Sequence, residues 1–227
     1  MLTIARGSRK AYSLILVGFL LLATPAFATT LFDNGAATTV NGYNIYGATS
    51  TADDFSIGGG GTIASVGFYF QNYSGIAGWN QDITYRFRAD SSGQPGSILA
   101  SGSGQNLLAV DSGLPWCCGG GNAYLVTFDL TSAFVAAAGT TYWLELTGAT
   151  GTDFAWWVTA SSNGTSLGFY DLGSGYQNSG NQFAFFLSDT PTGSQVPEPS
   201  SVVLSSLGLI AVGALRIRAR LAKSRKS

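Results

Sequence analysis

The sequence predicts an all-β protein whose main domain is an antiparallel β-sandwich, jelly-roll-like in arrangement. Between residues 29 and 189, apolar and polar side chains alternate over short runs, the period-two pattern of strands with one buried face. Turns rich in Gly, Ser and Asn separate these runs. The Cys…Trp…Cys spacing typical of immunoglobulin domains is missing, which favours the jelly roll.

Nine runs are predicted as strands, with one short helix among them. The strands are Thr39–Tyr46, Ile63–Gln71, Ile83–Ala89, Ser97–Ser101, Asn122–Leu130, Thr141–Thr147, Asp153–Ala160, Ser166–Asp171 and Gln182–Leu187. Ser132–Ala138 is the candidate helix. Alternation places the following side chains inward: Ala64, Val66, Phe68, Phe70, Ile83, Tyr85, Phe87, Phe154, Trp156 and Val158. It places Arg86 and Arg88 on an outward face, which we expect to be solvated.

The first 28 residues have the three parts of a secretory signal peptide. Arg6, Arg9 and Lys10 precede an apolar run over residues 11–22, which predicts a signal helix. Ala26 and Ala28 form an A-x-A cleavage site. We therefore expect signal peptidase and the secretion machinery as partners, and a mature chain that starts at Thr29.

The last 32 residues predict a membrane segment. After the main domain (29–189) and a polar linker (190–195), Val196, Pro197, Glu198 and Pro199 form an extended turn. A helix over about residues 200–217 is apolar on all sides and about 27 Å long, at the short end of a membrane span. The basic tail that follows favours a cytoplasmic C-terminus; its topology-determining residues are Arg216, Arg218 and Arg220.

This arrangement over residues 196–227 resembles the PEP-CTERM sorting signal of Gram-negative bacteria. The resemblance implies handling by exosortase, recognition of Pro197, Glu198 and Pro199, and cleavage near them. It also implies a transient stay in the inner membrane before delivery to the cell surface or extracellular matrix. This C-terminal motif also carries the label of an ice-binding protein C-terminal domain; that label follows the sorting tail and says nothing about ice binding.

The charge of residues 29–195 excludes several functions. This span contains two arginines, eleven acidic residues and no lysine, a net charge of about −9, and the whole chain has no histidine. An acidic surface repels nucleic acid and anionic lipid. Without histidine there is no Ser-His-Asp system. Carboxylate chemistry remains, and Glu145 is the best candidate acid for a glycoside hydrolase, the least favoured function; an outward solvated position is the alternative.

Other residues suggest binding or cross-linking. Asp53, Asp54 and Asp111 are candidate calcium ligands, calcium being the sole cofactor considered. Four tryptophans are candidate glycan contacts, with core packing as the favoured alternative: Trp79, Trp116, Trp143 and Trp157. Cys117 and Cys118 are the only cysteines, so a vicinal disulfide is expected, with free thiols or bridges between chains as alternatives.

Together these patterns predict a non-enzymatic exported protein of the cell surface or extracellular matrix. The alternative from another class is a carbohydrate-binding module that uses exposed tryptophans, with or without calcium. Extracellular polysaccharide is the expected partner in that case.

Overall fold

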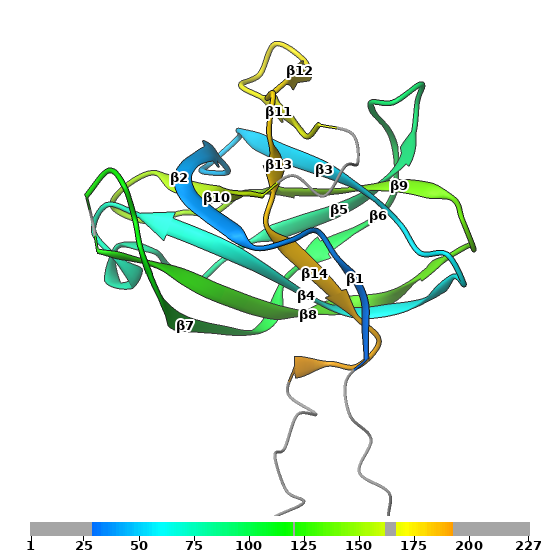
Figure 1. Cartoon of the computed structure of the whole chain (residues 1–227), viewed down its shortest axis with the longest axis horizontal. Helices are drawn as coiled ribbons and strands as arrows, with labels where there is room; N and C mark the ends of the chain where they lie inside the picture. The colour runs from blue at the N-terminus through cyan, green and yellow to red at the C-terminus, as the bar shows by residue number, and fades with distance from the viewer. Residues whose placement is uncertain (1–28, 120, 162–166, 193–227) are drawn as a thin grey trace, which may run out of the picture. The chain divides into compact units, whose positions relative to one another are not determined.

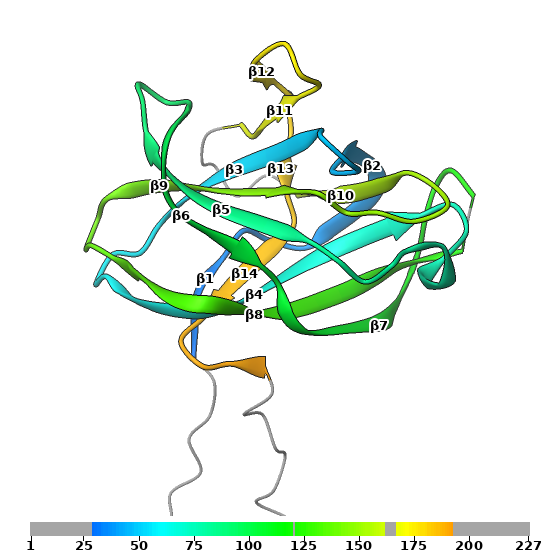
Figure 2. The same cartoon turned by 180° about the vertical axis from the view of Figure 1, so that it is seen from behind.

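The computed structural model describes residues 29–119, 121–161 and 167–192, and its regular secondary structure is almost entirely β-strand. Figure 1 and Figure 2 show two antiparallel sheets that face each other. The larger sheet contains β1 (Thr30–Asp33), β2 (Ala37–Asn44), β4 (Gly61–Asn72), β7 (Gln105–Pro115), β8 (Asn122–Ala136), β10 (Ala155–Ala160), β13 (Gln182–Phe183) and β14 (Phe185–Ser188). The smaller contains β3 (Ser50–Ser56), β5 (Thr84–Asp90), β6 (Pro95–Ser103), β9 (Thr141–Thr147), β11 (Phe169–Asp171) and β12 (Gln177–Asn178). The all-β prediction and the two antiparallel sheets expected of a sandwich are confirmed, while the jelly-roll arrangement stays a prediction.

The centre of the larger sheet is β4. It pairs with β8 along one edge, and with β14 and then β10 along the other. Val66 and Phe70 are fully buried, as their alternation predicts. The prediction that Ala64 shares their face is wrong, because the register shifts between Ile63 and Ser65. A bulge inserts an extra residue and reverses the faces beyond it, so Ile63 is the buried side chain.

Aromatic rings fill the space between the sheets. Phe87 on β5 stacks on Phe134 of β8 with ring centroids 4.4 Å apart, and Tyr85 stacks on Phe128 at 5.9 Å. These contacts join the smaller sheet to the larger one. Because aromatic side chains bury a large apolar area each, they dominate the stability of such a core.

The predicted helix Ser132–Ala138 is wrong. Strand β8 continues to Ala136 and stays paired with β4, where Phe134 lies opposite Ile63. Phe134 and Ala136 face the core, whereas Val135 between them is 71% exposed. The alanines favour a helix, but pairing along β4 and burial of alternate side chains outweigh that local preference.

Four strands were not predicted: β1, β3, β7 and β12. Strand β3 has the sequence STADDFS, and all of its residues except Ser56 are buried. Burial on both faces removes the period-two contrast that sequence reasoning needs. Strand β7 pairs with β8 at the side of the larger sheet and carries exposed apolar side chains such as Leu108.

Part of the outer face of the smaller sheet, around Trp143 and Glu145, is covered by Phe169 of β11 and by Tyr176 of the segment between β11 and β12. Strand β11 pairs with β3, and Phe169 meets Trp143 edge to face with ring centroids 5.4 Å apart. Tyr176 packs against the same small cluster. The smaller sheet is therefore buried on both faces around β9.

The two terminal segments predicted to act in export, residues 1–28 and 196–227, lie outside the described residues. Thr29, the predicted first residue of the mature chain, is described: its backbone nitrogen donates to Asp189 Oδ1 at 2.8 Å. In the part of the chain that the structure describes, no helix is both long enough and apolar enough to cross a membrane.

Candidate functional site

Three of the four tryptophans predicted as glycan contacts are buried. Trp79 is 4% exposed, stacks on Phe70 at a centroid distance of 4.5 Å, and donates its Nε1–H to Asp82 O. Trp143 and Trp157 have no exposed surface. A ring closed off from solvent cannot stack on a sugar, so these three contact predictions are wrong and the core-packing alternative holds for these rings.

Strand β10 presents different aromatic residues to solvent from those predicted. Trp157 points into the core, whereas Trp156 is half-buried on the opposite face and Phe154, just before the strand, is 54% exposed. The inward assignment of Phe154 and Trp156 is wrong. Two adjacent tryptophans give either face a large ring, so alternation alone could not decide between them.

Tyr73, Phe154 and Trp156 form a continuous group, which we call the aromatic strip. The Tyr73 ring meets the Trp156 ring edge to face at a centroid distance of 4.4 Å, and Phe154 lies 5.9 Å from Trp156. Tyr73 is 47% exposed. Tyr46 extends the strip beyond Phe154 at 6.0 Å. Sequence reasoning missed the strip because Tyr73 lies just past the end of β4, far from β10 in sequence.

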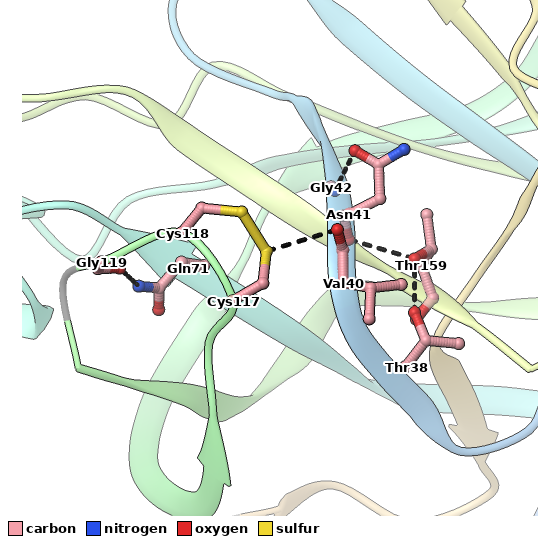
Figure 3. The surroundings of a disulfide bond; sticks show 9 residues. All are labelled: Thr38, Val40, Asn41, Gly42, Gln71, Cys117, Cys118, Gly119 and Thr159. Atoms are coloured by element: carbon pink, nitrogen blue, oxygen red, sulfur yellow. Dashed lines mark hydrogen bonds between the residues drawn. A yellow bond between two sulfur atoms is a disulfide. The ribbon is translucent and has the colours of Figure 1, made fainter.

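Beside the strip lies the loop that connects β7 to β8, with the predicted vicinal disulfide. The Cys117–Cys118 bond is present (Figure 3), with Cα atoms 3.8 Å apart. Cys117 N–H donates to Thr39 O on β2 at 3.1 Å. Cys117 Sγ lies 3.3 Å from Val40 O; since a disulfide sulfur carries no proton, this is a close contact only. Both contacts fix the loop to β2.

A second tether fixes the loop to β4. Gln71 Nε2 donates to Gly119 O at 3.2 Å (Figure 3). Strand β10 pairs with β2 on one side and with β4 on the other, so Trp156 lies between Asn44 and Gln71. The loop is therefore held to both strands that flank β10.

Trp116 packs against the backbone of β2 at Gly42. A Cβ atom on Gly42 would lie 3.2 Å from Trp116 Cη2 and 3.0 Å from Trp156 Cβ. Glycine thus leaves room for the close approach of these side chains, which a Cβ atom would crowd, and the half-buried Trp116 lies next to the aromatic strip. Of the four predicted glycan contacts, Trp116 is the one that the structure leaves near a solvent-facing surface.

Two buried polar atoms at this place have no hydrogen-bond partner among the described residues. They are Trp116 Nε1, a donor, and Gln71 Oε1, an acceptor. A buried polar atom without a partner costs about 1–3 kcal/mol. A water molecule both donates and accepts, so an enclosed water is the group that would satisfy such atoms.

Glu145 lies at the centre of an ion cluster on the outer face of the smaller sheet. It has no exposed surface. Its Oε1 accepts a hydrogen bond from Arg86 Nη1, and its Oε2 accepts from Arg88 Nε and from Tyr176 Oη. The Arg88 guanidinium also lies 5.5 Å from the centre of the Tyr176 ring. The predicted solvated face for Arg86, Arg88 and Glu145 is wrong.

The charged and polar groups of this cluster are paired with one another. Burial raises the pKa of Tyr176 above its ordinary value, and the adjacent Glu145 carboxylate raises it further. Tyr176 therefore stays protonated and donates to Glu145. Both oxygens of Glu145 are engaged, while a general acid or a nucleophile must reach its substrate. This geometry gives Glu145 a structural role.

The predicted calcium ligands are not gathered at one place. Asp53 faces the core, where its Oδ2 accepts from Asn34 Nδ2 and from Phe183 N–H; burial raises the pKa of Asp53 well above its usual range. Asp54 follows it on β3, whereas Asp111 is exposed on β7 of the other sheet. Within residues 29–119, 121–161 and 167–192 no three His, Cys, Asp or Glu side chains are grouped to hold a metal ion.

The comparison with protein families concerns the end of the chain. Residues 195–219 match the family model of the PEP-CTERM protein-sorting motif. The match includes the predicted recognition residues Pro197, Glu198 and Pro199 and the first basic residues of the tail, all outside the described part of the structure. It confirms the resemblance and supports exosortase-dependent sorting of an exported protein in Gram-negative bacteria. No curated protein matches the chain.

Proposed function

We propose that this carrier of a PEP-CTERM motif is a non-enzymatic protein of the cell surface or extracellular matrix. The observation that carries the proposal is the sorting motif at residues 195–219. In this reading signal peptidase cleaves after Ala28, and the helix at about residues 200–217 holds the chain in the inner membrane. Exosortase then cleaves near Pro197 and releases residues 29–195 outward.

The described residues support a non-enzymatic role. Glu145, the best candidate acid in the sequence, is enclosed by Arg86, Arg88 and Tyr176. The chain has no histidine, and residues 29–195 have no lysine, so imidazole general bases and lysine nucleophiles are missing from this span. We propose that the domain folds and works without a cofactor. A buried core and a disulfide are enough to hold the described residues in place.

The test is the intact mass and location of the mature protein in its host, with and without exosortase. We expect a chain that starts at Thr29, ends near Pro197, and reaches the surface only when exosortase is present. Replacing Pro197, Glu198 and Pro199 together by alanine should leave the protein in the membrane. Ser194→Ala in the linker is the matched control and should be sorted normally. A mature protein that still ends at Ser227 in the wild-type host would contradict the proposal.

A second candidate function is carbohydrate binding, which the aromatic strip favours. Exposed aromatic rings held on a rigid sheet are unusual on a surface with no partner. Because the strip and Trp116 need no metal ion to be held in place, we propose that such binding is independent of calcium. Addition of a chelator should leave it unchanged.

A further inference from the structure

The surface made by Tyr73, Phe154, Trp156 and Trp116 is the strongest unexplained feature of the domain. Trp156 lies on β10 between two paired strands, so its ring has a fixed position on the larger sheet. Tyr73 and Phe154 both lie against Trp156 and are about half exposed. Rings in this arrangement offer flat apolar area without an ordering cost on binding.

The disulfide loop adds a fourth ring and fixes its position. Trp116 precedes Cys117, whose backbone is tied to β2, and Gly119 is tied to Gln71 on β4. The bond between adjacent cysteines further limits the torsions of the loop. The vicinal disulfide therefore acts as a rigid support for Trp116 beside the strip.

The exposed rings of this surface fit a hydroxyl-bearing ligand. Trp116 Nε1 and Gln71 Oε1 are a donor and an acceptor without partners among the described residues, but both atoms are buried, so a sugar that stays on the surface does not reach them. A sugar hydroxyl can donate and accept at once, and the C–H groups on one face of a sugar ring pack on the electron-rich face of an aromatic ring. A group of exposed aromatic rings is the part of this surface on which a sugar ring can stack.

The charges favour an uncharged ligand. Residues 29–195 contain no lysine, and their two arginines are engaged by Glu145 on the other sheet. The titratable group nearest in sequence to the strip is Asp153, which accepts from Phe154 N–H and Ser74 Oγ. An acidic polymer would meet only negative charge here.

We propose that this surface binds a neutral polysaccharide by stacking sugar rings on Tyr73, Trp156 and Phe154, with Trp116 as a further contact. The proposal deepens the carbohydrate-binding candidate above and rests on it. It makes the disulfide loop part of the binding site and predicts preference for neutral over acidic polymers.

The test uses the full chain in mild detergent, so its result does not depend on exosortase processing. Pull-down with insoluble cellulose, chitin and β-1,3-glucan, and affinity electrophoresis in amylose, are compared with alginate as the acidic polymer. We expect binding to at least one neutral polymer. Any retention by alginate should come from the basic tail with Arg216, Arg218 and Arg220, and should be unchanged in variants of the strip. Tyr73→Ala and Phe154→Ala should each weaken binding several-fold, and Trp156→Ala at least tenfold. Leu108→Ala, an exposed apolar change on β7, is the matched control and should change nothing.

Three results would overturn the proposal. The first is no binding to any of the neutral polymers while the chain is folded. The second is binding that Tyr73→Ala and Phe154→Ala leave intact, since both side chains are exposed and their loss should not unfold the domain. The third is a wild-type dimer that becomes a monomer on Phe154→Ala, which would assign the surface to a second copy of the chain. If sorting failed in the host, the interpretation of these three results would not change.

Discussion

Replacing Glu145 by glutamine isolates the contribution of the ion cluster on the smaller sheet. Glutamine keeps the size of the side chain but removes its charge. It leaves one acceptor oxygen for three donors, and its amide NH₂ group faces guanidinium groups that are also donors. Arg86 and Arg88 then lose their counter-charge, although they stay partly buried with side-chain exposures of 33% and 16%.

The expected loss of stability follows from these contacts. A hydrogen bond that involves a charged group contributes about 1.5–3 kcal/mol, whereas a neutral one contributes about 0.5–1.5 kcal/mol. Three contacts, each weaker by about 1 kcal/mol, give about 3 kcal/mol. Removing one partner of a buried ion pair costs about 3–5 kcal/mol; the partial exposure of both arginines favours the lower end. For a domain of this size, 3 kcal/mol lowers Tm by about 6–12 °C.

The assay is urea unfolding of the full chain in detergent, followed by tryptophan fluorescence. Asp33→Asn removes one negative charge from an exposed position and keeps an oxygen that accepts from Gly35 N–H. It is the matched control and should change the free energy of unfolding by less than about 0.5 kcal/mol. A loss below about 1 kcal/mol for Glu145→Gln would refute the structural role argued for the cluster.

Three further predictions concern the core and the disulfide loop. The pKa of Asp53 is raised by burial. The contribution of this residue to folding stability is therefore complete below its unfolded pKa of about 4 and is lost as pH rises through its folded pKa. Asp53→Asn should therefore flatten the fall in stability above pH 4, measured by urea unfolding across pH. Replacing both Cys117 and Cys118 by serine should lower the free energy of unfolding by at most about 1 kcal/mol, because a bond between neighbours closes almost no loop. The intact mass of the wild type with and without reductant should reveal the bond as a difference of about 2 Da. Gly42→Ala should cost about 1–3 kcal/mol by overpacking and shift the fluorescence of Trp116, which it would contact.

Each of these predictions has an outcome that contradicts it. A stability profile of Asp53→Asn parallel to that of the wild type would show that this carboxyl does not titrate with folding. A large loss of stability in the double serine variant would mean that the disulfide holds more than its own loop. Wild-type stability for Gly42→Ala would mean that Trp116 does not pack on β2.

The sequence predicted the strands of this domain where one face is apolar and the other polar. Ile83, Tyr85 and Phe87 alternate cleanly, and all three are buried as predicted. Prediction failed where both faces are buried, as in β3, because the apolar contrast disappears there. It also failed at Ala64, since a bulge inserts a residue that no local pattern marks.

The predictions for the candidate site residues failed for a related reason. Arg86, Arg88 and Glu145 have the alternation of an outward face, and outward normally means solvated. The cover for that face comes from Tyr176 and its neighbours, more than thirty residues beyond Glu145 in sequence. Local patterns cannot reveal a cover made by a distant segment. The adjacency of Cys117 and Cys118, in contrast, is a purely local signal, and the disulfide it predicted is present.

The two sheets have different outer faces, and the difference bears on where a ligand could bind. On the smaller sheet, Trp143 and Glu145 are sealed beneath Phe169 and Tyr176. The two arginines of residues 29–195 are used in that seal, so they add little attraction for anions from outside. On the larger sheet, Trp156 and its neighbours stay open to solvent. The arginines are paired with Glu145 on the smaller sheet, whereas the aromatic rings are exposed on the larger sheet. Recognition by this domain should therefore depend on stacking rather than on charge. Binding at the strip should change little with salt concentration.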